Sequence, residues 1–559
     1  MIDPEKFDSV DLEKYGKTLM FFNEYEGAGL LFNRAAGKDS PGETGLKKNI
    51  YSCEWAQANR DSSALYALSK TNFNPGGESF GIQFYRGGVV YAAPVRKRNV
   101  MKTNGKIIRE KKGSVFKDLV YADFEPGALP DPKLFSKHLR SDFHTGGVCF
   151  SNSEKTIYFT ETIPKDTHSV LKIFRAQLID GKWRHKRELN FNSDNYSCAH
   201  PALSPDEAYL YFSSDMPGGY GGKDLYRCEK ADSGWGSPIN LGSSINTPGD
   251  EMFPYLYRNH VLFFTSNGYV GYGGLDIFSS VYKGSAWNRI RVEKRPLNSS
   301  ADDFALVFNP RNEHEILFSS NRDGNGTKDG IFYIYKYPVP ADTISGQLYD
   351  ELTENPIDGA FVYAIDRNTS DTLASTKSDK DGKFKMIIPP ADEFEEERDL
   401  ALVIKREGYE PTIIDIDDGD FDIDRPDSKK YDISVKKEIQ ENQVLLFHNI
   451  YFEKDKAVLT DKAKEVLHRI IRIMDETPEI SIELSAHTDC LADSAYNMDL
   501  SERRAQNAKR FLIMNGIDET RIIAKGYGET RPLNHCVDGV ECSEAEHAEN
   551  RRIEIRIKK

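Results

Sequence analysis

Asp489 and Arg504 are the two residues of this chain whose chemistry is easiest to state. Asp489 ends the segment S-A-H-T-D, and Arg504 lies within the segment 496–505. A carboxylate and a guanidinium held close together bind the ammonium and the carboxylate of a zwitterion, and arginine binds a carboxylate through two parallel hydrogen bonds. An isolated aspartate and arginine more often pair with each other on a protein surface. These two residues alone leave both interpretations open.

The secondary structure predicted around this pair is a small sheet covered by helices. Apolar residues at helical spacing predict two helices, one with Thr460 as its cap and one that stops at Gly516. Alternating apolar residues predict the strands. The predicted elements are helices at 459–474 and 494–515 and strands at 480–484, 522–523 and 553–557. This order makes an α+β sandwich, with Asp489 at a strand end and Arg504 on the following helix.

Four blocks of sequence surround the pair in a characteristic order. They are S-A-H-T-D (485–489), Y-N-M-D-L-S-E-R-R-A (496–505), G-Y-G-E (526–529) and N-R-R-I-E-I (550–555). Together they resemble the OmpA-like peptidoglycan-binding domain, which we place at 438–559. Four separate blocks in the family's order are far more specific than one aspartate and one arginine, so they favour a ligand over a mutual surface pair.

The resemblance implies a ligand and the residues that bind it. In the family, the aspartate takes the ammonium and the arginine takes the carboxylate at the free end of diaminopimelate, in the stem peptide of the cell wall. Here these residues are Asp489 and Arg504. Asn497 and Arg551 match further family positions near the ligand, and Thr488 flanks the aspartate. We therefore expect peptidoglycan as a partner.

The chain departs from the family pattern in two places. Where many members have a glycine after the aspartate, this chain has Cys490 followed by Leu-Ala-Asp, which leaves the shape of that loop open. The second departure is an insert that begins at Cys536 and ends at Cys542 around an Asp-Gly turn, and these two cysteines are disulfide candidates. A zinc site with His535 and His547 is the alternative, although Cys-x5-Cys is not a usual zinc spacing.

Cysteine usage and charge bear on the compartment. A disulfide indicates an oxidising compartment, and a cell-wall ligand lies outside the cytoplasm, so we expect the periplasm, in association with peptidoglycan and the outer membrane. The net charge of -14 argues against nucleic acid and anionic membranes as ligands. The chain starts with no secretory signal and has no run of about 18 apolar residues. We expect a mature or trimmed form, with a lipid anchor or an N-terminal domain removed.

Upstream, one strand-like pattern recurs about every 50 residues, which is typical of a β-propeller. The recurring segments I-Y-F-T, L-Y-F-S-S, L-F-F-T-S and I-L-F-S-S begin at Ile157, Leu210, Leu262 and Ile316, and Trp183, Trp235 and Trp287 repeat in the same frame. Two less regular units, at Leu19 with Asn49 and at Val89 with Asp118, give about six predicted blades over 15–338, with five or seven blades as the alternatives.

The segment H-P-A-L-S-P-D (200–206) resembles the PD40 repeat, a WD40-like repeat that also builds the propeller of the TolB family. We assign 1–340 to this propeller. Asp224 and Asp276 recur within the repeat and are interpreted as turn residues, and no convergent acids, bases or nucleophiles stand outside it. We therefore expect no enzyme activity and no cofactor, and we expect propeller faces that bind partner proteins.

The segment 321–329 begins like a calcium loop, but Phe332 stands where a bidentate glutamate is required. A hairpin turn between strands is the preferred interpretation, and we expect no metal site here.

A third module lies at 341–437. Its segments I-S-G-Q-L-Y-D (344–350), P-I-D-G-A-F-V-Y (356–363) and S-D-K-D-G-K-F (378–384) resemble the carboxypeptidase regulatory-like domain. That resemblance implies a small β-sandwich without catalytic residues. Alternating strands separated by Asp-Gly turns predict the same fold independently.

The order propeller, regulatory-like sandwich, OmpA-like domain resembles PorE-type periplasmic proteins of type IX secretion. We expect a noncatalytic anchor that binds peptidoglycan and docks secretion-complex or outer-membrane proteins through its propeller. Two alternatives stay open. One is a propeller enzyme that acts on glycan or peptide and is tethered to the wall. The other is a general envelope-stability protein that combines TolB-like and Pal-like roles.

Overall fold

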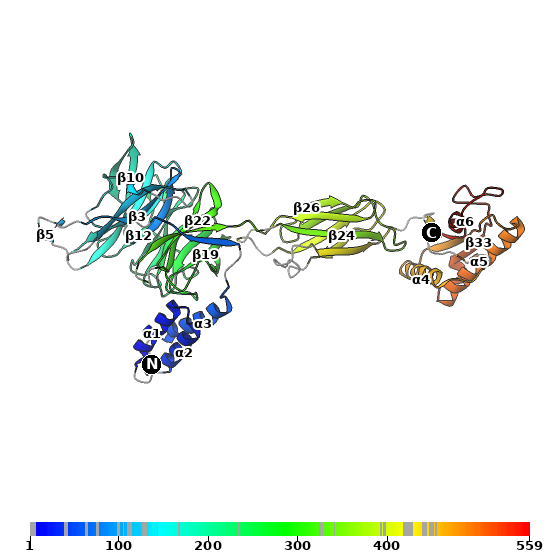
Figure 1. Ribbon diagram of the computed structural model, residues 1–559, viewed down its shortest axis with the longest axis horizontal. Coiled ribbons are helices and arrows are strands. Elements are labelled where there is room, and N and C mark those ends of the chain that lie inside the picture. Colours follow the sequence, from blue (N-terminus) through cyan, green and yellow to red (C-terminus); the bar gives the residue numbers. More distant parts are fainter. Residues whose placement is uncertain are drawn as a thin grey trace. The chain divides into compact units, whose positions relative to one another are not determined.

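The structure is a computed structural model, and it contains two compact units, Met1–Val339 and Pro340–Lys559 (Figure 1). Both units are rich in β-strands, and each has buried apolar cores of its own. The residues that the structure describes are 7–37, 43–61, 65–73, 78–97, 101–103, 106–108, 115–125, 131–141, 143–165, 168–232, 234–323, 326, 328–339, 341–391, 394, 398–416, 429–438, 444–446, 452 and 456–558.

The described residues of the first unit form five antiparallel sheets, four of four strands and one of five. The first two sheets contain β2 (Phe80–Tyr85), β3 (Gly88–Lys97), β6 (Val115–Asp123) and β7 (Lys133–Leu134), then β8 (Thr145–Phe150), β9 (Thr156–Pro164), β10 (Ser169–Ile179) and β11 (Lys182–Glu188). The third contains β12 (Cys198–Leu203), β13 (Tyr209–Ser214), β14 (Asp224–Ala231), β15 (Gly234–Trp235) and β16 (Ile239–Asn240).

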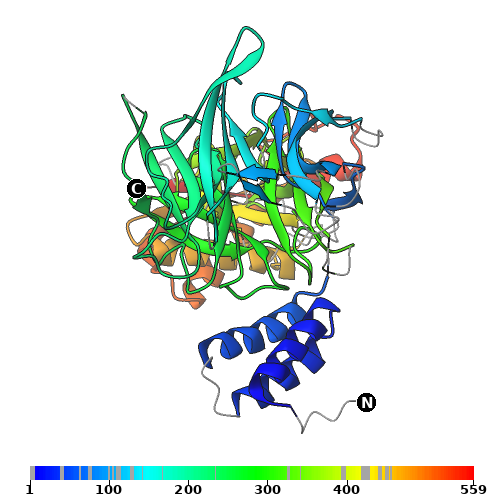
Figure 2. The same cartoon turned by 90° about the vertical axis from the view of Figure 1, so that its left-hand side faces the viewer.

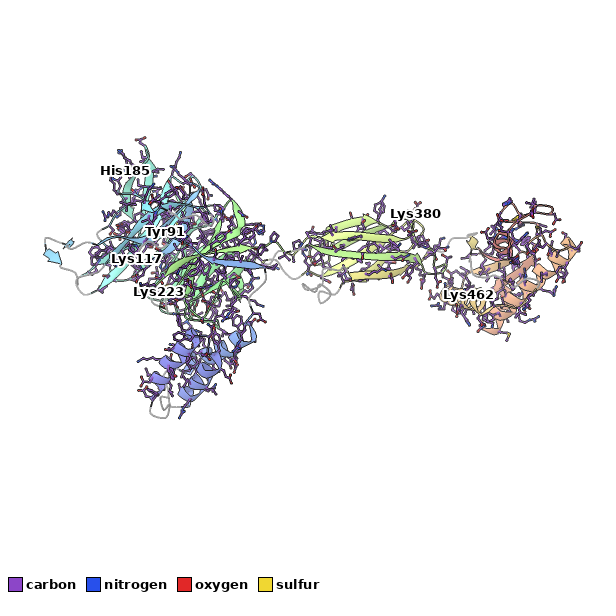
Figure 3. All side chains as sticks on the ribbon, viewed as in Figure 1. Tyr91, Lys117, His185, Lys223, Lys380 and Lys462 are labelled. Carbon is purple, nitrogen blue, oxygen red and sulfur yellow. A yellow bond between two sulfur atoms is a disulfide. The ribbon has the colours of Figure 1, made fainter. Side chains whose placement is uncertain are left out.

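The remaining strands of this unit complete the fourth and fifth sheets. The fourth contains β17 (Glu251–Tyr257), β18 (Val261–Ser266), β19 (Asp276–Lys283) and β20 (Ala286–Val292). The fifth contains β1 (Tyr66–Lys70), β23 (Gly330–Lys336), β22 (Asn312–Ser320) and β21 (Asp303–Asn309). A separate hairpin pairs β4 (Met101–Thr103) with β5 (Lys106–Ile108). Side chains fill the spaces between strands, as at Tyr91 on β3, which is fully buried (Figure 3).

One edge strand of each sheet bends at an equivalent place. In β2, β8, β12, β17 and β21 the pairing register shifts, and at each shift one residue has a positive φ. These residues are Gly81, Gly147, His200, Phe253 and Ala305, with φ of 66, 52, 55, 50 and 55°. A left-handed conformation costs a residue with a side chain about 1 kcal/mol, so its recurrence indicates that the packing of the five strands requires the bend. The five bends line one cavity of about 40 Å³.

The fifth sheet is completed by a strand from the start of the chain. β1 pairs antiparallel with β23, with Tyr66 opposite Lys336 and Lys70 opposite Phe332. Because β23 lies at the end of the unit, this pairing joins two segments that are far apart in the sequence. Of the calcium-like segment 321–329, residues 324, 325 and 327 lie outside the described part of the chain.

Three helices occupy the region where the sequence predicts the first repeat unit. They are α1 (Ser9–Phe21), α2 (Tyr25–Ala36) and α3 (Glu43–Ala58). The predicted strands at Leu19 and Asn49 are therefore wrong, since Leu19 lies in α1 and Asn49 in α3. Val89 and Asp118 lie on β3 and β6 of one sheet. The six predicted units thus correspond to one group of helices and five sheets.

The helices pack against the fourth sheet through the loop that precedes β19. Tyr272 in this loop is fully buried, its ring lies 4.7 Å from that of Trp55, and its carbonyl accepts a hydrogen bond from the hydroxyl of Tyr25 (3.0 Å). Figure 2 shows the three helices as a group beside one end of the sheets. None of the helices that the structure describes has the length and apolarity needed to cross a lipid bilayer.

The second unit begins with two sheets of three and four strands. The strands are β24 (Asp342–Asp350), β27 (Lys383–Ile388) and β30 (Lys429–Val435) in one sheet, and β25 (Phe361–Asp366), β26 (Asp371–Lys377), β28 (Leu400–Lys405) and β29 (Thr412–Asp415) in the other. Their buried faces share one apolar core that includes Ile344, Val362 and Leu402. Burial alternates along β24 and β27, as the alternating sequence predicts.

The second unit ends with an α+β domain, which confirms the fold predicted for this part. Its sheet has the order β31 (Val444–Leu446), β34 (Ile553–Lys558), β32 (Ser481–Ala486), β33 (Ile522–Gly526), and its helices are α4 (Asp461–Glu476), α5 (Ser494–Met514), the short 3-10 turn Glu519–Arg521 and α6 (Glu544–Asn550). The hydroxyl of Thr460 accepts a hydrogen bond from Ala463 N (3.2 Å) and so caps α4 as predicted.

Candidate ligand-binding site of the C-terminal domain

Asp489 lies just beyond the end of β32, in the segment where this strand leaves the sheet. Its side chain is 10% exposed, and its Oδ2 accepts a hydrogen bond of 2.7 Å from Nη1 of Arg551. Its Oδ1 accepts a longer bond of 3.4 Å from the backbone amide of Leu491. A buried carboxylate is stable only when it is paired, so the ion pair with Arg551 holds Asp489 in place.

Arg551 follows α6 and stands between two carboxylates. Its Nη2 donates to Glu544 at 2.6 Å, and the side chain of Glu544 is 69% exposed. Burial works to lower the pKa of Arg551, but the hydrogen bonds to Asp489 and Glu544 outweigh it and raise the pKa above its usual value. The buried Nε of Arg551 has no hydrogen-bond partner among the described residues. The guanidinium of Arg551 therefore keeps one unused donor.

Arg504 is the largest fully buried side chain in the described part of the chain. It lies on α5, and its Nε donates to the carbonyl of Lys456 (2.9 Å) while its Nη1 donates to the carbonyl of His487 (3.4 Å). Its guanidinium also lies 4.7 Å from the ring centre of Phe452. Arg504 thus contacts the backbone carbonyl of His487, two residues before Asp489. The ion pair of Asp489 is made with Arg551 instead.

The two remaining predicted residues are buried on either side of Asp489. The backbone amide of Thr488 donates to Gly528 O (3.0 Å), but its buried Oγ1 has no hydrogen-bond partner among the described residues. Asn497 donates from Nδ2 to the carbonyl of Ala492 (2.9 Å) and to Glu529. Asn497 therefore joins the loop after Asp489 to the G-Y-G-E block, and Thr488 keeps a hydroxyl without a partner among the described residues.

His487 belongs to the same buried cluster, although sequence reasoning assigned no role to it. Its ring is 1% exposed, stacks on Tyr527 with centres 5.6 Å apart, and lies 3.7 Å from a carboxylate oxygen of Glu554. Burial, with a contribution from Arg552, lowers the pKa of His487 to about 4. His487 is therefore neutral at neutral pH. Its position between Ala486 and Thr488 in the first block was the one signal that could have identified it.

The two departures from the family pattern lie close together. A disulfide joins Cys536 to Cys542, with Cα atoms 6.0 Å apart. Cys490 is a partly buried free thiol, and burial raises its pKa, with a further contribution from the charge of Asp538 in the disulfide loop. His535 Nε2 lies 3.8 Å from Cys542 Sγ. Sulfur atoms bonded to each other are not thiolate ligands, so the disulfide and the alternative zinc site exclude each other.

Comparison with known proteins assigns the C-terminal domain. Residues 451–545 match the model of the OmpA family. A stretch of 117 residues, 21% of this chain, is 39% identical to photosystem I P700 chlorophyll a apoprotein A2 of Gloeobacter violaceus and covers 13% of that protein. Another, also 117 residues and 21% of this chain, is 32% identical to outer membrane protein A of Bordetella avium and covers 57% of it. The chain therefore spans about half or less of the length of these curated relatives.

A solved structure is also similar over this domain. The peptidoglycan-associated lipoprotein from Burkholderia pseudomallei is 24% identical, with a TM-score of 0.18, over 20% of this chain and 86% of that one. The family match covers the segment that contains Asp489, Asn497 and Arg504. On the family match, the C-terminal part of this chain is an OmpA-like domain.

Proposed function

We propose that this protein is a noncatalytic anchor that binds peptidoglycan through its OmpA-like domain in the periplasm. The observation that carries the proposal is the buried ion pair of Asp489 and Arg551, together with two buried polar atoms that have no partners among the described residues: Nε of Arg551 itself and Oγ1 of Thr488, the residue before Asp489. Buried polar groups are almost always satisfied in proteins. Unsatisfied groups on a residue of the ion pair and on its chain neighbour indicate a place where a polar ligand completes the hydrogen bonding.

The charges of this cluster suit a zwitterion. Asp489 and Glu544 carry negative charge, and Arg504 and Arg551 carry positive charge. A ligand with one ammonium and one carboxylate therefore leaves the net charge of this cluster unchanged. The free end of diaminopimelate has these two groups on one carbon. We propose that its ammonium binds Asp489 and that its carboxylate binds the guanidinium of Arg504, with Arg551 Nε and Thr488 Oγ1 as further donors.

The periplasmic location has independent support. The disulfide between Cys536 and Cys542 is of a kind that persists in oxidising compartments such as the bacterial periplasm. The match to the OmpA family and the similarity to outer membrane protein A favour association with the cell envelope. We propose a protein held at the peptidoglycan close to the outer membrane.

The choice of stem peptide tests this function. The full chain is titrated by calorimetry with two soluble stem peptides, one containing diaminopimelate and one containing lysine at the same position. Lysine lacks the terminal carboxylate, and a lost charge-assisted hydrogen bond costs about 1.5–3 kcal/mol, so we expect about tenfold to hundredfold weaker binding of the lysine peptide. Equal affinity for both peptides would contradict the proposed site.

For the first unit, we propose that the five sheets are the blades of a β-propeller that docks partner proteins. The proposal is supported by the five equivalent bends, which line one cavity, and by the closing pair of β1 and β23. The residues that line this cavity include His200 and Tyr255 but, among those the structure describes, no aspartate or glutamate. A pair of facing carboxylates would favour the alternative of a glycan-cleaving enzyme, so this lining favours a docking role.

The resemblance of the domain order to PorE-type proteins leads us to propose subunits of a type IX secretion machinery as the partners. Purification of the full chain from native membranes tests this. Co-purification of secretion-complex subunits is the expected result, whereas co-purification of general envelope-stability proteins alone would favour the TolB-like and Pal-like alternative.

A further inference from the structure

The first unit contains the same loop twice. Gly-Gly-Tyr-Gly-Gly at 218–222 precedes Asp224 on the third sheet, and Val-Gly-Tyr-Gly-Gly at 270–274 precedes Asp276 on the fourth. Asp224 accepts hydrogen bonds from the amides of Tyr220 (2.6 Å) and Gly221 (3.0 Å). Asp276 accepts one from Gly273 (3.0 Å), the residue equivalent to Gly221.

Two equivalent glycines make the same close approach to the next sheet. A Cβ atom added to Gly221 would lie 2.2 Å from the carbonyl oxygen of Thr247, and one added to Gly273 would lie 2.4 Å from that of Ala301. These separations are too short for a side chain, so both positions require glycine. The two loops therefore have the same backbone arrangement, and any difference between them lies in what covers them.

The loop on the fourth sheet is covered by the helices of the same unit. Tyr272 is fully buried, and its hydroxyl donates to Asn59 O (3.0 Å) while its ring meets the edge of Trp55 at 4.7 Å. The amide of Gly271 donates to the hydroxyl of Ser52 (3.3 Å). Ser52 and Trp55 are three residues apart on α3 and so lie on one face of this helix. This contact shows what kind of surface the loop accepts.

In the loop on the third sheet, the equivalent tyrosine side chain is exposed to solvent. Tyr220 is 51% exposed, and every residue of 217–222 is exposed. Lys223, which follows the loop (Figure 3), is partly buried and pairs with Asp250 at 3.2 Å. An exposed tyrosine whose backbone amide is held by Asp224 is suited to act as an aromatic anchor at a protein interface.

A chain of contacts links the two loops. Gly221 lies against Thr247, and in the same segment the amide of Asp250 donates to the side chain of Asn267 (2.8 Å). The carbonyl of Asn267 accepts a hydrogen bond from the ammonium of Lys48 on α3 (2.9 Å). The exposed loop is therefore connected, through one intervening segment, to the place where α3 already packs.

We propose that the loop at 218–222 is a docking site for an α-helix of another protein, one that presents an aromatic ring and a serine or threonine hydroxyl three residues apart, as α3 does. The inference rests on the proposed docking function and names its site. A second copy of this chain is not the occupant, because its own Ser52 and Trp55 are used against its own Tyr272. Self-association through this loop would require the release of α3.

A helical peptide with the sequence of residues 43–60 is the probe for this site. Its binding to the full chain is measured by fluorescence anisotropy, with Tyr220→Ala as the test variant and Tyr337→Ala as the matched control, since Tyr337 is also exposed (47%). Loss of an aromatic anchor typically costs about 2 kcal/mol, so we expect about thirtyfold weaker binding to Y220A and none of this loss with Y337A. A peptide with Trp55→Ala should bind the wild-type protein as weakly as the unchanged peptide binds Y220A.

Three results would overturn the proposed site. Unchanged peptide affinity of Y220A would place the peptide elsewhere, for instance on the loop of Tyr272. Self-association of the full chain that Y220A abolishes, seen by analytical ultracentrifugation, would identify a second copy as the occupant. Co-purification from native membranes distinguishes this inference from the proposed docking function. Partners that remain bound to Y220A would reject this site and leave the docking function intact. A wild-type protein that co-purifies with no partner would reject the docking function itself.

Discussion

At the scale of single residues, the C-terminal domain is organised around charges that have been removed from water. Asp489 and Arg551 pair at 2.7 Å, and Arg504 is buried against two backbone carbonyls. Each charge is costly to bury, and each is held by a specific partner. These partners fix the charges without a ligand, so binding of the proposed zwitterion would carry a lower ordering cost.

His487 supplies a prediction at this scale. Burial lowers its pKa to about 4, against about 6.5 in an unfolded chain. Between these values the unfolded state binds a proton that the folded state does not, so stability is full above about pH 6.5 and falls as the pH drops towards 4. We expect up to about 3 kcal/mol to be lost over this range, measured by urea unfolding of the unit Pro340–Lys559 at several pH values.

A variant isolates this effect from the carboxylates that titrate over the same range. His487→Phe keeps a ring against Tyr527 and cannot bind a proton, so its stability should fall less steeply towards acid than that of wild type. His468→Gln on α4 is the matched control and should follow wild type. Parallel curves for wild type and H487F would show that His487 does not carry the pH dependence.

The sequence singled out five candidate site residues but did not predict how they pair. The four blocks identified Thr488, Asp489, Asn497, Arg504 and Arg551, and the structure buries all five. The partner of Asp489 could not be predicted, because Arg551 reaches it only when β32 and α6 are brought together by the sheet. The free hydroxyl and the unused Nε could not be predicted either, since they depend on distances between atoms.

At the scale of elements, the insert at 536–542 is a loop closed by its own disulfide. A closed loop of this length restricts the unfolded chain, and its loss costs about 2 kcal/mol. We expect the double variant Cys536→Ser with Cys542→Ser to lower the stability of Pro340–Lys559 by this amount in urea unfolding. Cys490→Ser is the control and should leave the stability unchanged within about 0.5 kcal/mol.

The same measurement addresses the alternative metal site. If reduced wild-type protein regains its full stability on addition of zinc, the cysteines act as ligands and the disulfide interpretation is wrong. If only reoxidation restores it, the disulfide is the native state of this loop.

Helices were predicted well where the apolar pattern extended over many residues and poorly where it covered only a few. The spacing over 459–474 and 494–515 agrees with α4 and α5 to within a few residues. The short segments at Leu19 and Asn49 resemble the repeat and so predict strands, yet both lie in helices. A run of four apolar residues fits either structure, and the buried positions Leu12, Gly16 and Met20 of α1 decide for the helix.

At the scale of the whole molecule, the two proposed binding activities lie in different compact units. The docking loop around Tyr220 belongs to Met1–Val339, and the site of Asp489 belongs to Pro340–Lys559. Units with separate cores can be altered one at a time, because substitutions far apart and without shared partners act independently. Y220A should therefore leave peptidoglycan binding intact, and a change at Asp489 should leave the partner proteins bound.

The binding of whole peptidoglycan tests the central claim most directly. Full-length protein is sedimented with purified diaminopimelate-type peptidoglycan as wild type, Asp489→Asn and Asp499→Asn. The first substitution keeps the shape of the aspartate side chain and removes its charge, and Arg551 keeps Glu544 as a partner, so D489N should fold. Asp499 on α5 is exposed and serves as the control.

We expect wild type and D499N to sediment with the wall, and D489N to remain in the supernatant with an affinity lower by about tenfold or more, as for a lost charge-assisted hydrogen bond. A wild-type protein that stays soluble, or a D489N protein that sediments as wild type does, would contradict the proposal that this domain holds the wall through Asp489.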